Sequence, residues 1–251
     1  MGKIIAVVNQ KGGVGKTTSA VNLTAALHDL GLRVLLCDFD PQANATSGLG
    51  LDKRKIKHSI YDVTINNVSA ESAIVQTKYG DVLPATADLA GATVELISAP
   101  HREHQLEIAL KSVKDKYDII FIDCPPSLEL LTLNGLCAAD GILVPVQCEY
   151  YALEGLSDLM ATLRTVKRRL NPRLEIFGVA LTMFDGRTNF STQVAQEVRK
   201  HFPGKVFSTV VPRNIRLAEA PSHGIPVTAY DRSSRGAAAY RTMAEEIKAK
   251  L

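Results

Sequence analysis

The sequence predicts an α/β fold in which a single doubly wound, mostly parallel sheet carries helices on both faces. Short, almost continuous apolar runs alternate along the chain with amphipathic segments of helix length. Apolar runs of this kind are typical of strands that are covered on both faces, and their alternation with helices is typical of parallel sheets. The chain has 251 residues, of which 46% are hydrophobic, so it can bury a substantial core. We therefore expect a single domain over residues 1–251.

Six apolar runs are the expected strands, at residues 4–8, 34–37, 119–122, 142–146, 176–181 and 206–211. Six amphipathic segments are the expected helices, at residues 16–30, 103–115, 128–138, 153–170, 192–201 and 235–250. Residues 49–83 are less regular, and we interpret them as short helices and turns inserted after the second strand. The basic cluster at 52–57 is typical of a solvated face.

A glycine-rich turn at residues 11–18 joins the first strand to the first helix and reads Lys-Gly-Gly-Val-Gly-Lys-Thr-Thr. In such a turn, backbone N–H groups face phosphate oxygens, and the helix that begins at Gly15 or Lys16 adds the positive end of its dipole. We expect Lys16 to reach the β- and γ-phosphates of a nucleotide, Thr17 to coordinate Mg²⁺ and Thr18 to close on the α-phosphate. The residues expected to bind the nucleotide here are Lys11, Gly12, Gly13, Val14, Gly15, Lys16, Thr17 and Thr18.

Carboxylates follow two of the expected strands and would face this loop. Phosphoryl transfer needs a Mg²⁺ ion held in place and an attacking water held in line. Asp123 suits the role of holding Mg²⁺ through water, and Asp38 would help to hold the metal shell. Asp40, on the same face of an extended chain as Asp38, is the candidate for orienting or polarising the water. The alternative, a helix N-cap or a turn, is less favoured because the same chain carries a phosphate loop.

The loop departs from the ordinary pattern G-x-x-x-x-G-K-[ST], because Gln10 stands where the first glycine would be. Lys11 lies where the chain leaves the phosphates, and a cation there can reach a nucleotide held by a second copy of the protein. The loop thereby resembles the deviant Walker A family, which includes ParA, MinD and the nitrogenase iron protein, and in which this lysine crosses the dimer interface. The resemblance implies a P-loop NTPase fold and a catalytic part for Lys11 beside Lys16 and Asp40.

Further motifs extend the resemblance over essentially the whole chain. Residues 40–46, 123–127, 149–155, 212–214 and 219–222 match chromosomal ParA proteins, often called Soj, in order and spacing. The resemblance implies an ATPase that uses ATP and Mg²⁺, forms a sandwich homodimer with ATP and binds double-stranded DNA without sequence preference. A ParB-like centromere-binding protein would stimulate its slow hydrolysis and release the dimer. Pro212 and Asn214 would lie against adenine, and Glu149 would approach the partner's nucleotide.

The distribution of charge agrees with a polyanionic partner. Residues 160–251 contain 16 Lys and Arg against 7 Asp and Glu, a balance of +9, whereas residues 1–159 contain 13 against 19, a balance of −6. A basic half of this kind favours nucleic acid. We expect Arg187, Arg213 and Arg216 to contact DNA phosphates. Because the first expected strand begins at Lys3, we expect no operator-reading helix-turn-helix and only nonspecific DNA binding.

The sequence also bears on location and on the cysteines. No apolar run approaches the length of a membrane span, and the first strand stands where a signal peptide would be. We therefore expect a cytoplasmic, nucleoid-associated protein that does not bind membranes. The four cysteines show no C-x-x-C spacing, and we expect reduced, buried thiols rather than metal ligands or disulfides. They are Cys37, Cys124, Cys137 and Cys148.

Three alternative functions are less favoured by the sequence than the ParA-like one. A MinD-like membrane-associated, protein-positioning ATPase would end in a basic amphipathic helix that inserts into lipid. The apolar stripe of the tail is modest, so we expect it to pack against the domain; it comprises Tyr240, Met243, Ala244, Ile247 and Leu251. An iron–sulfur reductase would need cysteines from both subunits, and Cys124 and Cys137 lack a matching second placement. A DNA-binding scaffold without turnover is disfavoured by Asp40.

Overall fold

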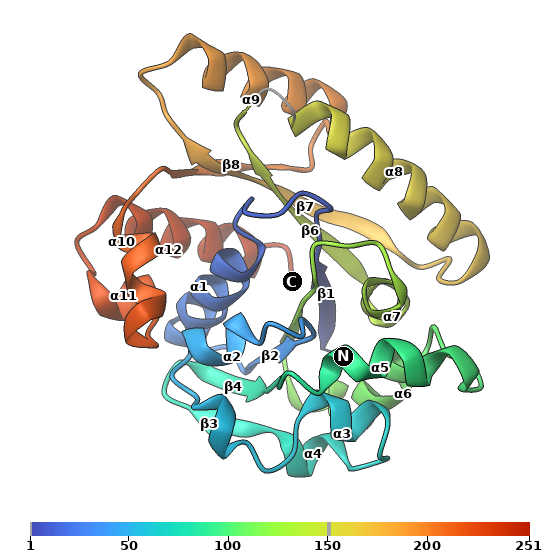
Figure 1. The fold of residues 1–251 in the computed structure, drawn as a ribbon. Coiled ribbons are helices and arrows are strands. Elements are labelled where there is room, and N and C mark those ends of the chain that lie inside the picture. Colours follow the sequence, from blue (N-terminus) through green and yellow to red (C-terminus); the bar gives the residue numbers. More distant parts are fainter. Residues whose placement is uncertain (1, 150–151) are drawn as a thin grey trace.

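The computed structural model describes residues 2–149 and 152–251, and it contains one eight-stranded sheet with the order β3-β4-β2-β5-β1-β6-β7-β8. All neighbouring strands are parallel except β3 and β4, which form an antiparallel hairpin at one edge. The strands are β1 Lys3–Val7, β2 Val34–Asp38, β3 Val75–Thr77, β4 Gly80–Leu83, β5 Ile119–Asp123, β6 Gly141–Gln147, β7 Glu175–Phe184 and β8 Val206–Pro212. The expected mostly parallel α/β fold is confirmed (Figure 1).

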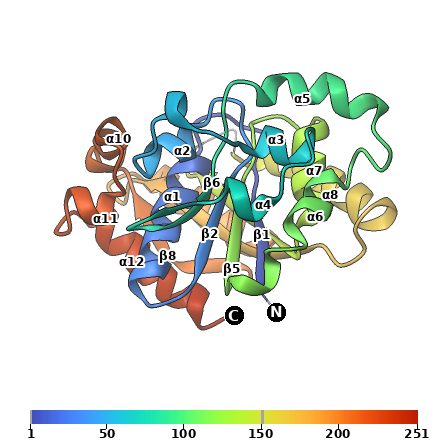
Figure 2. The same cartoon turned by 90° about the horizontal axis from the view of Figure 1, so that it is seen from below.

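Helices cover both faces of this sheet. The α-helices are α1 Lys16–Asp29, α2 Asn44–Gly48, α3 Ile60–Thr64, α4 Ala70–Ala73, α5 Leu89–Glu95, α6 Gln105–Leu110, α7 Leu130–Ala138, α8 Ala152–Arg169, α9 Asn189–His201, α10 Arg216–Glu219, α11 Val227–Tyr230 and α12 Arg235–Lys248. Short 3₁₀ helices are η1 Lys53–Lys55, η2 Leu96–Ser98, η3 Lys114–Lys116 and η4 Ala220–His223. Helices α1 and α12 lie on one side of the strands and α6, α7 and α8 on the other (Figure 2).

The central strand β1 shows why these apolar runs have no alternation. Ile4 and Ala6 belong to the core that the helices α3 to α9 cover. Ile5 and Val7 belong to the core on the other face, which α1 and α12 cover. Successive side chains of a strand point to opposite faces, and both faces are covered here. Every residue of the strand must therefore be apolar or shielded.

Two expectations about the elements were wrong in part. Residues 49–83 contain the strands β3 and β4 besides short helices, and β4 pairs with β2 in parallel. The expected helix at 103–115 is divided into α6 and η3. Both strands of the hairpin have four residues or fewer, which is too short for a periodic pattern to emerge.

The C-terminal helix α12 packs its apolar stripe into the core, as expected. Tyr240, Met243 and Ile247 are all at most 1% exposed, and the Tyr240 hydroxyl hydrogen-bonds Ser19 of α1 at 3.0 Å. Leu251 is the exception to the expectation, because it is 45% exposed. Within the described part of the chain, no helix has both the length and the apolarity to cross a membrane.

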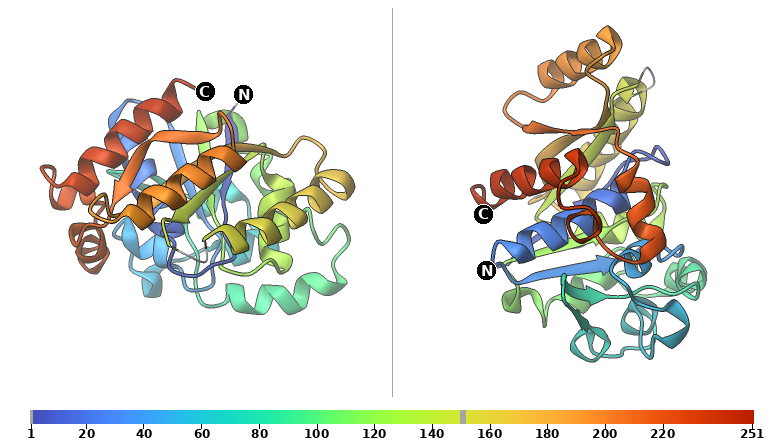
Figure 3. Two further views of the ribbon diagram at one scale, coloured as in Figure 1. Left: turned by 90° about the horizontal axis from the view of Figure 1, so that it is seen from above. Right: turned by 90° about the vertical axis from the view of Figure 1, so that its left-hand side faces the viewer.

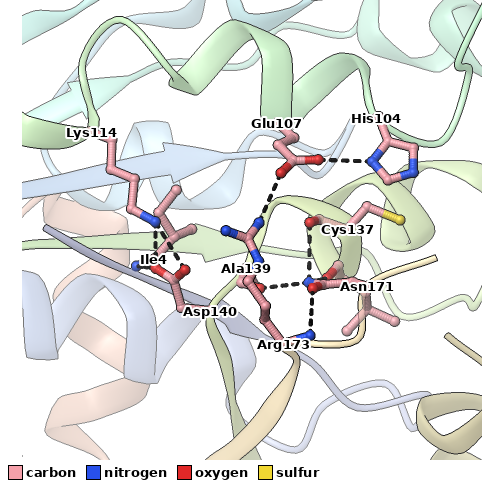
Figure 4. Close-up of polar contacts among 10 residues, drawn as sticks. Ile4, His104, Glu107, Lys114, Cys137, Ala139, Asp140, Asn171 and Arg173 are labelled. Carbon is pink, nitrogen blue, oxygen red and sulfur yellow. Dashed lines mark hydrogen bonds and ion pairs between the residues drawn. The ribbon is translucent and has the colours of Figure 1, made fainter. Parts of the chain in front are cut away.

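Polar side chains hold the amino ends of the strands opposite the glycine-rich loop (Figure 4). Asp140 accepts hydrogen bonds from the Ile4 N–H and the Lys114 ammonium group, both at 2.8 Å. The Asn171 amide donates to three carbonyl oxygens at the end of α7, of which Ala139 is the nearest at 2.7 Å. Carbonyls at a helix end lack intrahelical partners, so Asn171 satisfies them and fixes α7 against β7.

Candidate nucleotide-binding site

The loop between β1 and α1 has the backbone conformation of a phosphate cradle. Gly13 and Gly15 have φ angles of +74° and +90°, which non-glycine residues rarely adopt. Helix α1 begins at Lys16, directly after Gly15. A Cβ atom added to Gly12 would meet no described atom within 4 Å. This part of the loop is therefore open to a ligand or to a second molecule.

Lys16 is buried beside the acidic residues of the site. It is 7% exposed, and its ammonium group donates to the carbonyl oxygen of Lys11 at 3.1 Å. Burial lowers the pKa of Lys16, while the nearby carboxylates of Asp123 and Asp40 oppose that shift. Among the described residues, no carboxylate forms an ion pair with Lys16, so the loop holds a desolvated cation, an arrangement that favours phosphate.

Asp38 and Asp123 end neighbouring strands and are paired positions of the β2–β5 ladder. Both are fully buried. The Asp38 carboxylate accepts hydrogen bonds from the backbone N–H and the hydroxyl of Thr46, both at 2.7 Å, and from the Asp40 N–H at 3.3 Å. Burial raises the pKa of Asp38, whereas the hydrogen bonds from Thr46 lower it.

Asp123 is the side chain whose surroundings fit a divalent cation. Among the described residues, neither of its carboxylate oxygens has a hydrogen-bond partner. Burial raises the pKa of Asp123 well above its usual range, and Asp38 raises it further. The Thr17 hydroxyl lies close enough to oppose this rise, without the geometry of a full hydrogen bond. A buried carboxylate beside a hydroxyl supplies the hard oxygen donors that Mg²⁺ prefers.

The described residues contain no group of three or more His, Cys, Asp or Glu placed to hold a metal by themselves. Mg²⁺ is usually bound by one or two protein carboxylates together with substrate phosphates and water. Asp40 lies beside the pair, and its carboxylate accepts a hydrogen bond from the Gln42 N–H at 2.9 Å. The four cysteines are buried and free, as expected.

A cavity of about 330 Å³ connects the loop with the segment after β8. Gly15 and Thr18 line it from the loop side, and Pro212 and Asn214 line it from the other. Its remaining lining residues are Thr182, Met183, Val211, Arg213, Ile215, Leu217, Ala218 and Tyr240. The structure thus brings two residues of the predicted phosphate loop, Gly15 and Thr18, and both residues predicted for adenine to one cavity.

Glu149 and Lys11 lie at the open side of the loop. The Lys11 ammonium group is 3.7 Å from one Glu149 oxygen, and the Arg213 guanidinium group donates to the other at 3.2 Å. Both side chains of the Lys11–Glu149 pair are partly exposed, at 35% and 46%. Tyr150 and Tyr151, which follow Glu149 in its motif, lie outside the described residues.

The three arginines predicted to bind DNA each contact a carboxylate of the same chain. Arg187 pairs with Asp185 at 2.8 Å, and Arg213 pairs with Glu149. Arg216 pairs with Glu219 at 2.8 Å and also with Asp231 at 3.3 Å. The three come from different elements, at the ends of β7 and β8 and in α10.

Sequence reasoning missed several side chains of the site. Thr46 holds Asp38, and Thr182 donates to the Val14 carbonyl at 2.8 Å beneath the loop. Met183, which has a φ of +50°, and Tyr240 line the nucleotide cavity. Thr46 lies inside the motif at 40–46 and was therefore within reach of the sequence. The other three come from distant segments that only the fold brings to the loop.

Comparisons with known proteins agree with this geometry. A family model described as "AAA domain" matches residues 2–176. The chain is 55% identical over 251 residues to sporulation initiation inhibitor protein Soj of Bacillus subtilis (strain 168), covering 99% of both chains. It is 51% identical over 247 residues to chromosome-partitioning ATPase Soj of Thermus thermophilus, covering 98% of this chain and 96% of that relative.

Two solved structures share the fold at substantial identity. Cobyrinic acid a,c-diamide synthase from Mycobacterium smegmatis with bound ADP and magnesium is 39% identical with a TM-score of 0.85, covering 98% of this chain and 93% of that chain. The cell division ATPase MinD of Pyrococcus furiosus is 32% identical with a TM-score of 0.82, covering 100% of both chains. The chain also carries the buried pair Asp38 and Asp123 and the lysine of the deviant loop, Lys11. Together with these residues, the similarities show that the chain belongs to the ParA/Soj family of chromosome-partitioning ATPases.

Proposed function

We propose that this chain is an ATP-dependent DNA-segregation ATPase in which ATP and Mg²⁺ drive formation of a sandwich homodimer. The dimer binds double-stranded DNA without sequence preference, and hydrolysis stimulated by a ParB-like protein releases it. One observation carries the proposal: the carboxylates of Asp123 and Asp40 lie near the buried ammonium group of Lys16, in a loop that is open at Gly12. We place this activity in a single ATPase domain over residues 1–251, in the cytoplasm and on the nucleoid.

In this proposal the buried residues bind and orient the nucleotide. Lys16 and the N–H groups of residues 12–18 hold the phosphates. Thr17 and Asp123, with Asp38 behind them, would hold Mg²⁺, which supplies charge neutralisation at the phosphate oxygens when bound. Asp40 orients the attacking water, and its hydrogen bond from the Gln42 N–H fixes the carboxylate for that task.

The proposed dimer uses the open side of the loop. Among the described residues, the one carboxylate that pairs with the Lys11 ammonium group is that of Glu149, at a long distance and partly exposed, and exposed ion pairs contribute little to stability. Exchange of this contact for a phosphate of the partner's nucleotide is therefore inexpensive. Because Lys11 must come from the second copy, turnover of the monomer should be slow.

The proposed DNA contacts also exchange exposed ion pairs of this chain for contacts with phosphates. Arg187, Arg213 and Arg216 are exposed, so their intramolecular ion pairs are screened by solvent. A DNA phosphate accepts the same bidentate hydrogen bonds as a carboxylate. The +9 balance of residues 160–251 adds a general attraction to the polyanion.

The second candidate is a MinD-like, membrane-associated protein-positioning ATPase, favoured by the 32% identity to Pyrococcus furiosus MinD. The buried stripe of α12 is the observation that weighs against it, because Tyr240, Met243 and Ile247 already pack inside the chain. Sedimentation with anionic vesicles in the presence of ATP separates the two. Pelleting with the vesicles would favour the second candidate.

The decisive experiment is DNA binding by the Asp40→Ala protein with ATP and with ADP, across a salt titration. We expect this variant to bind ATP without cleaving it, and to bind unrelated DNA sequences only with ATP. Lys16→Ala is the matched control, because it should bind neither nucleotide nor DNA. Normal hydrolysis by Asp40→Ala would contradict the role of Asp40, and the absence of DNA binding in both states would contradict the partitioning function.

A further inference from the structure

A groove runs along α8 and past the C-terminal end of α9, on the face of the sheet away from α1 and α12. Two cavities of about 340 and 380 Å³ lie along it and share Met160 and Arg164 of α8. The two helices lie side by side over β6, β7 and β8 at the outer end of the molecule (Figure 3). No described residue of the nucleotide cavity lines this groove. It is therefore a separate surface.

The floor of the groove is apolar. Leu156, Leu163 and Ile176 line it together with Met160 and Phe202. Met160 is half-buried, between a solvated surface and the core beneath it. Unbranched, polarizable methionine side chains adapt to the apolar side chains of a partner and are enriched at such interfaces.

The rim of the groove is basic and unneutralised. Arg164, Lys167 and Lys205 line it, and within the described part of the chain none of them forms an ion pair with a carboxylate. Glu175 is the one acidic residue among the lining residues of the two cavities. By contrast, Arg187, Arg213 and Arg216 are each paired with a carboxylate.

We infer that this groove docks an acidic amphipathic helix of a partner protein. Apolar residues of the helix would cover Met160 and Leu163, and its carboxylates would meet Arg164, Lys167 and Lys205. Residues 156–167 of α8 extend over about 17 Å, so the docked helix has about three turns. A surface made only for DNA has no use for an apolar floor, whereas a helix-binding groove requires one.

The test uses the full chain and a synthetic peptide of about 12 residues with leucines at helical i, i+3, i+4 and i+7 spacing and glutamates elsewhere. Methionine methyl groups labelled with ¹³C report the place of binding, because the chain has only four methionines. Met160 lies in the groove, Met183 lies in the nucleotide cavity, and Met243 lies in the core. We expect the peptide to shift the Met160 signal and ATP to shift the Met183 signal.

Charge reversal then tests the rim. Arg164→Glu with Lys167→Glu should weaken binding of the labelled peptide at least about tenfold in fluorescence anisotropy, as expected for loss of complementary charge. Arg168→Glu is the matched control on the same helix, because Arg168 does not line either cavity. Met160→Glu should abolish binding while thermal unfolding confirms that the variant is folded.

Three results would overturn the inference. The first is a Met160 signal that the peptide leaves in place. The second is equal binding of a scrambled peptide with the same composition but no apolar stripe. The third is a Met160 shift caused by a DNA duplex or by anionic vesicles and not by the peptide. None of these results depends on ATP hydrolysis or on dimer formation.

Discussion

At the scale of single residues, the carboxylates of Asp38 and Asp123 oppose the stability of the ligand-free protein. Burial raises the pKa of both side chains. The folded protein therefore holds a proton at these groups more tightly than the unfolded chain does. The contribution of these two carboxyl groups to the free energy of unfolding falls as the pH rises above about 4, the pKa of an unfolded aspartate, towards their raised pKa in the folded state. When Mg²⁺ and nucleotide bind, the positive charge of the ion offsets the loss of stability that these buried carboxylates cause.

Replacement of Asp123 by asparagine should accordingly stabilise the ligand-free protein and end its activity. We expect Asp123→Asn to raise the melting temperature at neutral pH by at least about 2 °C, with a smaller gain near pH 4. Wild-type protein should gain further stability from ATP with Mg²⁺, and the variant should gain little. Thermal unfolding at two pH values, with and without ATP and Mg²⁺, measures both the gain in melting temperature from the substitution and the gain from the ligands. A variant less stable than wild type at both pH values would contradict this account.

Thr46 is expected to position Asp38 through its hydroxyl, which also accepts a hydrogen bond from the Ala85 N–H at 3.0 Å. Thr46→Val removes the hydroxyl and leaves buried polar groups unpaired, which costs about 1–3 kcal/mol. Thr46→Ser keeps the hydroxyl and is the matched control. Urea unfolding should separate the two variants, and a Mg²⁺ titration of ATP hydrolysis should show a weaker apparent Mg²⁺ affinity for Thr46→Val alone. Equal behaviour of both variants would rule out the positioning role.

At the scale of elements, the phosphate loop combines a turn that requires glycine at two positions with an open position at Gly12. Gly12 lacks a positive φ, and a Cβ atom there meets nothing within 4 Å, so valine is compatible with the folded monomer. In the proposed dimer this space belongs to the second copy. We expect Gly12→Val to bind ATP and remain monomeric.

Light scattering of the Asp40→Ala protein with ATP, with and without Gly12→Val, measures this difference. Binding of a fluorescent ATP analogue controls for an intact loop. A dimer in the double variant would show that Gly12 does not face the partner.

Most of the elements near the site were predictable from the sequence, because β1, β2 and β5 are apolar on both faces and the motifs follow their ends. Elements at the periphery were not. β4 is four residues long and begins at a glycine, and pairing with β2 rather than local pattern makes it a strand. Met183 and Tyr240 enter the nucleotide cavity from segments more than 160 residues beyond the loop. Local sequence patterns do not predict such contacts, and no sequence feature predicted the groove beside Met160.

At the scale of the whole molecule, the separation of charge predicts how DNA binding depends on salt. We expect the ATP-bound Asp40→Ala protein to bind DNA with an affinity that falls steeply as the salt concentration rises. Each single substitution to alanine, at Arg187, Arg213 or Arg216, should reduce the slope of log K against log[salt] by about 1. Lys111→Ala, at an exposed position outside the basic half, should leave the slope unchanged. Slopes that none of the arginine variants alters would place the DNA interface elsewhere.

The order of the strands also has a consequence for synthesis on the ribosome. β1 is the first strand to be made, yet its neighbours are β5 and β6, which end at Asp123 and Gln147. Tyr240, which closes the nucleotide cavity and bonds Ser19, belongs to the last helix. The nascent chain therefore carries an unpaired central strand through half of translation, a state prone to aggregation. It completes its nucleotide cavity only when the final helix has emerged. A chain that lacks α12 should therefore not bind ATP.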